Sequence, residues 1–485
     1  MANVRVFLLL CTFSISLATR SFWRGRILDE FHGDTLTLPP GKSLPEEQWF
    51  EQQTDPYSPI DLDTFQQRYF TNSEYFKAQD GPVFLLIGRE GTANPRWMIE
   101  GAWLNYAKEF GALCIQLEQR FFGKSHPNIR SPSDNYVFSS SEIDVTDVAI
   151  FITEMKKKYN LTSKNRWIIF GGGYSGSLAA WTRIKFPHLA HGAVSSSGAV
   201  IGKLDFREYY DVVANSILDC RMSVKEAFSE LENQLTTSPK HLEELFQLCD
   251  PIETPTDLDK SNLFDIMASI FASVVQSNGL PYAKHSVKEI CSIMNDENKG
   301  SPLDRLAGIN KIFLEEDDSK CLDYKYDNMI EQLKVNSWDA PAVVSGKLTW
   351  FFLLCKEFGY FQTSNNASYV FGNHFQLDFF LKQCSDVFGE RFKQASIEKN
   401  IYNDDVIYGG FDIKSTNTIY IQGSEDPWHP LGLTESTDSG YQTVFIKGAA
   451  HCADMFEPRD DDLPELKAAR GKIREYIAEV LNQSQ

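Results

Sequence analysis

A short apolar segment that runs directly into a glycine-rich turn constrains the fold of this chain more than any other feature of its sequence. Residues 167–170 (Trp-Ile-Ile-Phe) are typical of a buried strand, and Gly171-Gly-Gly-Tyr-Ser-Gly-Ser-Leu-Ala-Ala-Trp181 follows without a break. The small residues after the glycines favour a helix, which ends near Pro187. A strand, a sharp turn and a helix in this order predict one unit of a mostly parallel sheet with crossover helices.

Similar patterns lie on both sides of this unit. Strand-like apolar runs cover 82–88, 112–117, 192–200, 418–423 and 443–448. Apolar residues recur at helical spacing in 141–158 and in 463–481. The alternation of strands and helices indicates an α/β fold.

A long helical block interrupts this alternation. Between about 203 and 400 the pattern changes to helical stretches, among them 224–235, 242–248 and 263–275. We therefore predict a sheet-forming domain made of 19–202 and 401–485, with a helical insertion, or cap, over 203–400. Such a block is expected to cover the end of the sheet where ligands usually bind.

The first residues predict a secretory signal peptide, 1–18. Arg5 gives a positive start, Val6 to Leu17 form an apolar run too short to span a bilayer, and Ser16-Leu-Ala18 suits signal peptidase. A secreted or lysosomal protein without a membrane anchor is expected, because no later apolar run could span a membrane. The formal net charge of −19 argues against nucleic acid as a partner, since phosphate binding needs clustered Lys and Arg.

The cysteines fit an oxidising compartment. Of nine cysteines, Cys11 leaves with the signal peptide, and six of the others lie in the predicted insertion without the CxxC spacing of a zinc or redox site. These six predict disulfides that staple the insertion; they are Cys220, Cys249, Cys291, Cys321, Cys355 and Cys384. Glycosylation sequons begin at Asn160, Asn366 and Asn482.

Two loops that follow strands carry the residue types of a hydrolytic site. Asp426 follows the run 418–423, and His451 follows the run 443–448. An α/β-hydrolase has its nucleophile, acid and histidine in this chain order at the carboxyl edge of the sheet. The carboxylate would fix the tautomer of the imidazole, and the imidazole would act as general base. A lone Asp or His is more often a turn or surface residue, but their places after successive strands favour catalysis.

The turn at 171–177 departs from the G-x-S-x-G pattern of a hydrolase nucleophile. Residues 171–175 place Gly173 at the tip of the turn, whereas residues 173–177 place Ser175 there without the closing glycine. Distance from the strand favours the first frame, in which Ser175 lies in the first turn of the helix and bonds to the backbone.

Two other classes of site fit less well. The glycines at 171, 173 and 176 match a dinucleotide-binding fingerprint, but no acidic residue between 177 and 204 could hold a ribose. No HExxH or comparable metal-ligand spacing occurs, so we expect neither a metal nor a cofactor.

Several ordered motifs extend along the chain from Trp49 to His451. They are Trp49 to Tyr69, Gly81-Pro-Val-Phe84, Gly88-Arg-Glu-Gly91, Glu118-Gln-Arg-Phe-Phe-Gly-Lys-Ser125, Phe170 to Trp181, Cys355-Lys-Glu-Phe-Gly359, Gly423-x-x-Asp-Pro-Trp428 and Gly448-x-x-His451-Cys452. In these motifs the chain resembles the prolyl carboxypeptidase and dipeptidyl peptidase II family of serine peptidases over nearly its whole mature length.

The resemblance implies an α/β-hydrolase with roles for individual residues. It makes Asp426 and His451 members of a catalytic triad and places the family's serine on Gly173. It further implies an oxyanion-hole region built from the backbone N–H of Tyr174 and the loop that contains Glu90 and Gly91.

The resemblance has consequences for three further features of the chain. In the same loop Arg89 stands where the family has glycine, and Trp428 is expected to contact substrate. The cysteine order of the family implies the pairs Cys220–Cys291, Cys249–Cys321 and Cys355–Cys384, with Cys114 and Cys452 as free thiols.

Glycine carries no nucleophile, and removing the serine of a triad costs on the order of a million-fold in turnover. The sequence therefore predicts a silenced serine exopeptidase that binds peptides or peptide termini. The alternative is an active exopeptidase that cleaves next to proline with Ser175 or Ser177 as substitute nucleophile. The sequence leaves the oligomeric state open, a homodimer included.

Overall fold

The computed structural model describes residues 22–27, 38, 41–77, 79–127, 131–252, 254–365, 369–436 and 440–483. The predicted signal peptide and the sequon at Asn366 lie outside the described residues.

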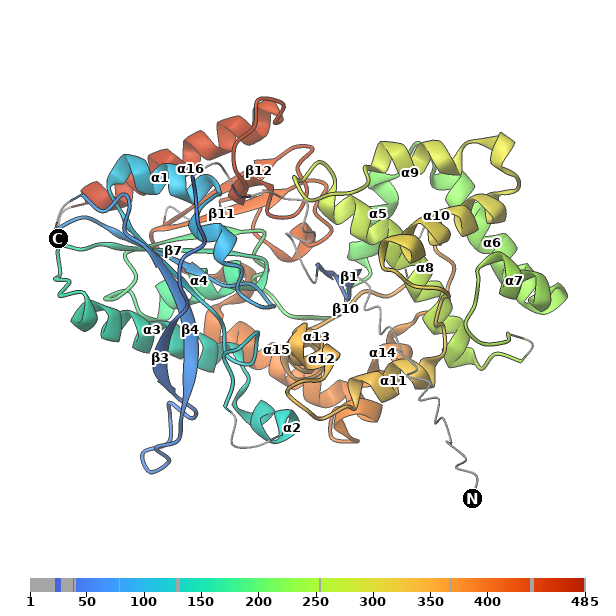
Figure 1. Cartoon of the computed structure of the whole chain (residues 1–485), viewed down its shortest axis with the longest axis horizontal. Helices are drawn as coiled ribbons and strands as arrows, with labels where there is room; N and C mark the ends of the chain where they lie inside the picture. The colour runs from blue at the N-terminus through green and yellow to red at the C-terminus, as the bar shows by residue number, and fades with distance from the viewer. Residues whose placement is uncertain are drawn as a thin grey trace, which may run out of the picture.

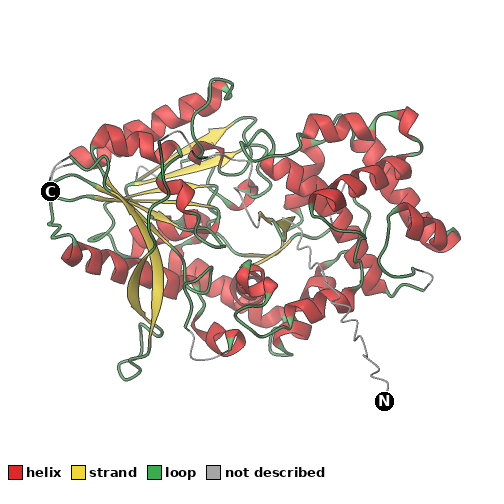
Figure 2. Cartoon of the chain, in the orientation of Figure 1, coloured by secondary structure: helices red, strands yellow, loops and turns green. Residues whose placement is uncertain are grey.

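One eight-stranded sheet forms the centre of the larger half of the molecule (Figures 1 and 2). Its strand order is β12-β11-β8-β7-β5-β6-β4-β3. The bounds are β3 Gln48–Gln53, β4 Thr64–Asn72, β5 Val83–Ile87, β6 Leu113–Leu117, β7 Trp167–Gly172, β8 Gly192–Ser196, β11 Thr418–Gly423 and β12 Tyr441–Ile446. Only β4 runs against its neighbours; the other pairs are parallel. This is an α/β-hydrolase sheet, which confirms the predicted fold class.

Helices cover both faces of the sheet (Figure 1). Helices α1 (Ala102–Phe110) and α16 (Pro464–Asn482) lie on one face, and α3 (Ser141–Lys158) and α4 (Tyr174–Lys185) lie on the other. Successive side chains of β7 point to opposite faces of the sheet. Ile168 and Phe170 pack in the hydrophobic core on the side of α1 and α16, whereas Trp167 and Ile169 pack in the core on the side of α3 and α4. Strands buried on both faces read as continuous apolar runs, which is why β5, β6 and β7 were predictable.

A helical block joins the sheet through β8 and returns to it at β11. Its helices are α5 (Glu208–Ser216), α6 (Arg221–Thr237), α7 (Pro239–Leu245), α8 (Asp257–Ser277), α9 (Val287–Met294), α10 (Pro302–Glu316), α11 (Tyr326–Leu333), α12 (Pro341–Val344), α13 (Lys347–Leu353), α14 (Leu377–Phe388) and α15 (Gln394–Tyr408). Short strands β9 (Lys203–Asp205) and β10 (Gly359–Phe361) pair within it. The division at 202/203 and 400/401 stays a prediction, and its second boundary falls inside α15.

Three disulfides staple the helical block. They join Cys220 to Cys291, Cys249 to Cys321 and Cys355 to Cys384, which are the pairs that the resemblance implies. Cys114 and Cys452 are free thiols and buried. No helix in the described ranges combines the length and apolar character needed to cross a bilayer.

A short hairpin near the N-terminus lies between the sheet and the helical block (Figure 1). Its strands are β1 (Phe22–Trp23) and β2 (Arg26–Ile27), joined through Arg24 and Gly25. Arg24 forms an ion pair with Asp265 of α8 at 2.5 Å and donates to the side chain of Gln383 in α14 at 3.0 Å. These contacts anchor the hairpin to the helical block, and sequence patterns gave no sign of it.

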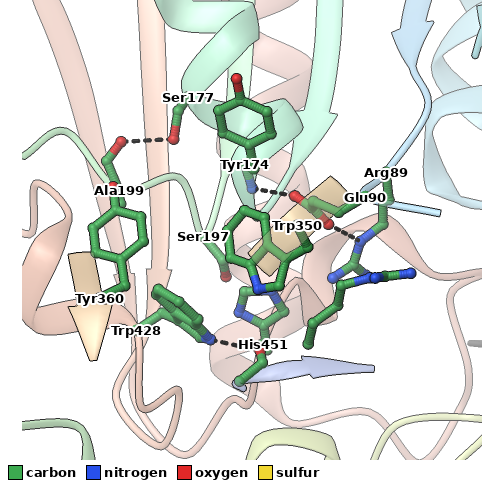
Figure 3. A pocket seen from close by; sticks show the side chains of 13 residues that line it. Arg89, Glu90, Tyr174, Ser177, Ser197, Ala199, Trp350, Tyr360, Trp428 and His451 are labelled. Carbon is green, nitrogen blue, oxygen red and sulfur yellow. Dashed lines mark hydrogen bonds and ion pairs between the residues drawn. The ribbon is translucent and has the colours of Figure 1, made fainter. Parts of the chain in front are cut away.

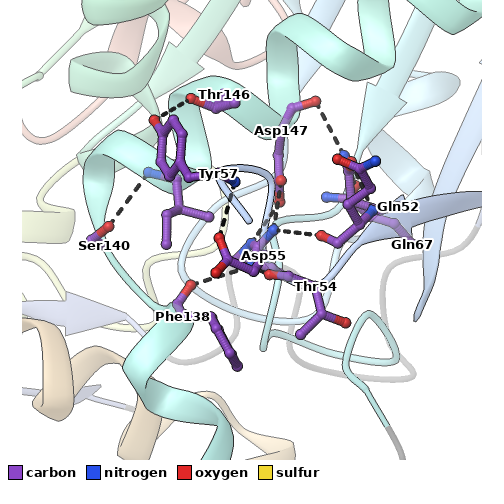
Figure 4. Close-up of polar contacts among 12 residues, drawn as sticks. Gln52, Thr54, Asp55, Tyr57, Gln67, Phe138, Ser140, Thr146 and Asp147 are labelled. Carbon is purple, nitrogen blue, oxygen red and sulfur yellow. Dashed lines mark hydrogen bonds and ion pairs between the residues drawn. The ribbon is translucent and has the colours of Figure 1, made fainter. Parts of the chain in front are cut away.

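Buried polar side chains attach the β3–β4 hairpin to α3 (Figure 4). Nε2 of Gln52 donates to Oε1 of Gln67 at 3.0 Å and to the carbonyl of Asp147 at 3.2 Å. The Asp147 carboxylate pairs with buried Arg120 at 2.6 Å. Because these strands bury glutamines that are satisfied by hydrogen bonds, their sequence lacks the apolar run by which the other buried strands were predicted.

Candidate active site

The turn between β7 and α4 consists of a single residue, Gly173. Its φ of 64° and ψ of −130° lie where glycine pays no steric penalty. Gly171, two residues earlier, allows the turn to close, since a Cβ there would lie 2.0 Å from the carbonyl oxygen of Ser175. The structure thus places Gly173 at the tip of a sharp strand-to-helix turn, as in the first reading frame.

Asp426 and His451 meet at the carboxyl edge of the sheet. Strands β11 and β12 are parallel neighbours, so the loops after them are adjacent. Oδ2 of Asp426 lies 2.9 Å from Nδ1 of His451, and Oδ1 accepts the backbone N–H of Trp428 at 3.0 Å. Asp426 is fully buried and His451 nearly so. The pair therefore has the geometry in which a carboxylate fixes an imidazole.

Charge pairing outweighs burial in this pair. Burial disfavours the charged imidazole, but the carboxylate of Asp426, followed by Cys452, raises the pKa of His451 above its ordinary value. Burial also acts against the Asp426 carboxylate, whose pKa is nevertheless lowered, mainly by His451. The pairing therefore favours the ionised form of both groups against the effect of burial.

The free nitrogen of the imidazole faces the glycine of the turn. A Cβ built on Gly173 would lie 3.3 Å from Nε2 of His451, 3.3 Å from Oε1 of Glu90 and 3.6 Å from Nη2 of Arg89. A side chain at position 173 would therefore contact the nitrogen that Asp426 leaves free.

The N–H groups predicted to form an oxyanion hole are engaged within the protein. Oε1 of Glu90 accepts the backbone N–H of Tyr174 at 2.6 Å (Figure 3). Oε2 of Glu90 lies 3.9 Å from Nε of Arg89, and the N–H of Gly91 donates to the Arg89 carbonyl at 2.7 Å. Glu90 thus contributes its carboxylate to the site, a role that sequence reasoning did not assign.

The two serines of the alternative reading frame donate to backbone carbonyls. Oγ of Ser175 is fully buried, donates to the carbonyl of Gly88 at 2.7 Å and accepts from the side chain of Gln119 at 3.1 Å. Ser177 lines the pocket, but its Oγ donates to the carbonyl of Ala199 at 2.6 Å (Figure 3).

A small pocket lies beside Gly173 and His451. Trp350, Tyr360 and Trp428 form its aromatic walls, and Gly25 and Arg26 bring the N-terminal hairpin to it. Nε1 of Trp428 donates to the Gly25 carbonyl at 3.0 Å, and this hydrogen bond joins the N-terminal hairpin to the aromatic wall. Trp428 was predicted for this place. Tyr360 directly follows the motif Cys355–Gly359 and Trp350 lies shortly before it, but neither was predicted to line a pocket. Gly25 and Arg26 lie far from every motif in sequence, and no spacing rule could have found them.

The remaining predicted residues lie away from the pocket. Asn160 and Asn482 are exposed, as glycosylation acceptors must be. Within the described ranges no three His, Cys, Asp or Glu side chains are grouped so that they could share a metal ion.

An α/β-hydrolase sheet with a buried Asp–His pair beside its strand–turn–helix elbow defines the serine-hydrolase class of site. A family model described as serine carboxypeptidase S28 matches residues 52–473, and the chain belongs to this family.

Relatives of known name agree with the family. The chain is 33% identical over 458 residues to thymus-specific serine protease of Homo sapiens, covering 91% of this chain and 88% of the relative. It is 25% identical over 436 residues to lysosomal Pro-X carboxypeptidase of Homo sapiens, covering 84% and 82%. Among solved structures it is similar to a proline iminopeptidase of Mycobacterium smegmatis, with a TM-score of 0.40, 12% identity and coverage of 90% and 99%.

Proposed function

We propose that this protein is a silenced serine exopeptidase, in which Gly173 occupies the nucleophile position and the remaining site binds peptides by their termini. One observation carries the proposal: a Cβ on Gly173 would lie 3.3 Å from the free nitrogen of His451. A serine there would place its hydroxyl in reach of the general base, and glycine offers no atom that could form an acyl-enzyme.

The neighbouring groups support this assignment. Ser175 and Ser177 donate to carbonyls, so their hydroxyls are held by the backbone rather than by His451. Neither serine is therefore poised for acyl transfer in the protein as it stands.

The ligand class follows from the family and from one relative. A family of serine carboxypeptidases indicates peptide ligands, and one relative is named for Pro-X carboxypeptidase activity. That relative is lysosomal, which together with the disulfides suits a secreted or lysosomal location. A homodimer remains one option for the oligomeric state.

The test compares the natural protein with its Gly173→Ser variant on proline-containing peptides, with Gly173→Ala as the matched control that adds only a Cβ. We expect all three proteins to bind the peptides and only the serine variant to hydrolyse them. Hydrolysis by the natural protein that Ser175→Ala or Ser177→Ala abolishes would establish the active alternative instead.

A further inference from the structure

The strand β3 forms one edge of the eight-stranded sheet and pairs only with β4 (Figure 1). This pairing covers the whole strand without a bulge. Just beyond it, the N–H of Thr54 donates to the carbonyl of Asp63 at 2.8 Å. Hydrogen-bonded pairs alternate along an antiparallel ladder, so the even-numbered residues of β3 bond to β4. The backbone N–H and C=O groups of Trp49 and Glu51 therefore point away from the sheet.

These outward groups are open. At the next odd position, the N–H of Gln53 donates to Oε1 of Gln52 at 3.2 Å, and its carbonyl accepts from Arg120 at 3.1 Å. Within the described ranges, no hydrogen bond reaches the outward groups of Trp49 and Glu51. Both residues are exposed, Trp49 to 42%. The strand contains neither proline nor lysine, the residues that commonly protect an edge, so it is a template for a further strand.

A groove runs along this edge between β3 and α3. Phe50 and Met155 form its apolar part. Two acidic and two basic side chains also line it: Glu51, Glu154, Lys157 and Lys158. Because these charges balance, the groove is complementary to a second copy of itself rather than to a strongly charged partner.

We propose that β3 pairs edge to edge with β3 of a second copy of this chain, antiparallel and with the two-fold axis at Phe50. In this register Trp49 and Glu51 of the partner subunit exchange both backbone hydrogen bonds, and by symmetry every open group on both copies is satisfied. The two Glu51 carboxylates do not face each other directly, an arrangement that would destabilise the pair. Phe50, which already contacts Phe151 edge-on at 5.5 Å, meets its symmetry mate over the groove.

The rest of the molecule is compatible with this pairing. The strands β11 and β12, which precede Asp426 and His451, lie at the opposite edge of the sheet, so the pocket stays open in the dimer. Helix α3 runs from Phe151, beside Phe50, to Lys158, whose Nζ lies 3.4 Å from Oε1 of Gln48. The predicted glycosylation acceptor at 160 therefore lies past the end of the strand and not over its centre.

Sedimentation velocity of the full-length secreted protein tests the proposal with two variants at one position. Glu51→Pro removes an outward N–H but no hydrogen bond to β4, whereas Glu51→Ala removes the same carboxylate and keeps the N–H. We expect the natural protein and Glu51→Ala to be dimers. We expect the dissociation constant of Glu51→Pro to be at least ~10-fold higher, because each dimer loses two backbone hydrogen bonds.

Two outcomes of this measurement would overturn the proposal. A natural protein that stays monomeric would leave the edge to an extended segment of a different protein. A dimer whose dissociation constant is unchanged in Glu51→Pro would have its interface elsewhere. Neither outcome affects the proposed silencing at position 173, which is tested by hydrolysis.

Cysteine cross-linking tests the register independently of any loss of folding in Glu51→Pro. In the proposed pair, the Cα atoms of position 49 and of position 51 in the partner are about 5.5 Å apart, within reach of a disulfide. Each position lies about 8–9 Å from its own symmetry mate, which is too far. We expect a mixture of Trp49→Cys and Glu51→Cys to form linked dimers on oxidation, and neither variant to do so alone. A mixture of Trp49→Cys and Gln53→Cys is the matched control, and cross-links in it or in a single variant would overturn the register.

Discussion

The absence of a side chain at position 173 affects the chemistry of this site but not its fold. Gly173 has a positive φ, and the turn it forms needs no Cβ. Asp426 and His451 are paired without any group at position 173, because the loops after the neighbouring parallel strands β11 and β12 bring them together. A glycine at position 173 is therefore compatible with the surrounding geometry.

Restoring the serine should cost stability. In Gly173→Ser the new side chain adopts a conformation that L residues rarely tolerate, and its Cβ approaches Glu90 and His451 to 3.3 Å. We expect the free energy of unfolding to fall by about 1–3 kcal/mol, the usual cost of a strained residue at an active site. Urea unfolding of the two proteins measures it, and a variant as stable as the natural protein would contradict this account of the turn.

Removing one partner of the buried Asp–His pair should destabilise the protein. Asp426→Ala leaves His451 buried without its carboxylate, so burial then dominates and lowers the imidazole pKa. We expect a loss of about 3–5 kcal/mol in unfolding free energy, the range for a broken buried ion pair. Chemical denaturation measures the loss, and NMR titration follows the pKa. A His451 pKa that stays high in the variant would show that another group sets it.

At the scale of elements, α3 and α15 carry buried carboxyl groups near the first residue of α4. The hydroxyl of Tyr174 donates to Asp144 at 2.8 Å, which links α3 to the first residue of α4. Burial raises the pKa of Asp144 to about 8, and burial with the charges of Glu357 and Asp405 raises that of Asp404 to about 9. Folded Asp144 and Asp404 thus hold protons that the unfolded chain releases near 3.8.

These groups predict that the protein is most stable in acid. Their stabilising effect is fully present below pH 3.8 and is lost progressively as pH rises toward 8 and 9, because the folded state then binds more protons than the unfolded state. We expect the urea midpoint to fall between pH 5 and pH 8, and to fall less in Asp144→Asn. A midpoint that rises over this interval would refute the assignment.

At the scale of the whole molecule, the N-terminal hairpin connects the sheet with the helical block. Gly25 lies so close to the pocket wall that a Cβ would come within 2.1 Å of Nε2 of Gln362 and 2.5 Å of the Trp428 ring. Only glycine fits this place, so the hairpin is an integral wall of the pocket.

Gly25→Ala should displace the hairpin. Gly279→Ala is a matched control, since Gly279 also has a positive φ but no atom near its Cβ position. We expect Gly25→Ala to become sensitive to proteolysis near residue 27 and to lose peptide affinity. Gly279→Ala is expected to lose stability through backbone strain alone. Limited proteolysis with N-terminal sequencing measures the difference between the two variants. Equal protection of both would count against the hairpin as a wall of the pocket.

Sequence reasoning reached the fold but only part of the site. Strands β5, β6, β7 and β11 were predictable because burial on both faces makes them apolar throughout. The β3–β4 hairpin was missed because its glutamines are buried with hydrogen-bonded partners. Asp426 and His451 follow strands and could be found, whereas Arg26 and the Glu90 carboxylate enter the pocket through tertiary contacts that leave no local pattern.

Labelling with a fluorophosphonate, followed by peptide mapping, tests the central claim most directly. The reagent forms a covalent adduct only with a serine that a general base activates. The account predicts no adduct on the natural protein or on Gly173→Ala, and one adduct on residue 173 of Gly173→Ser. An adduct on Ser175 or Ser177 of the natural protein would contradict it and establish an active peptidase with a displaced nucleophile.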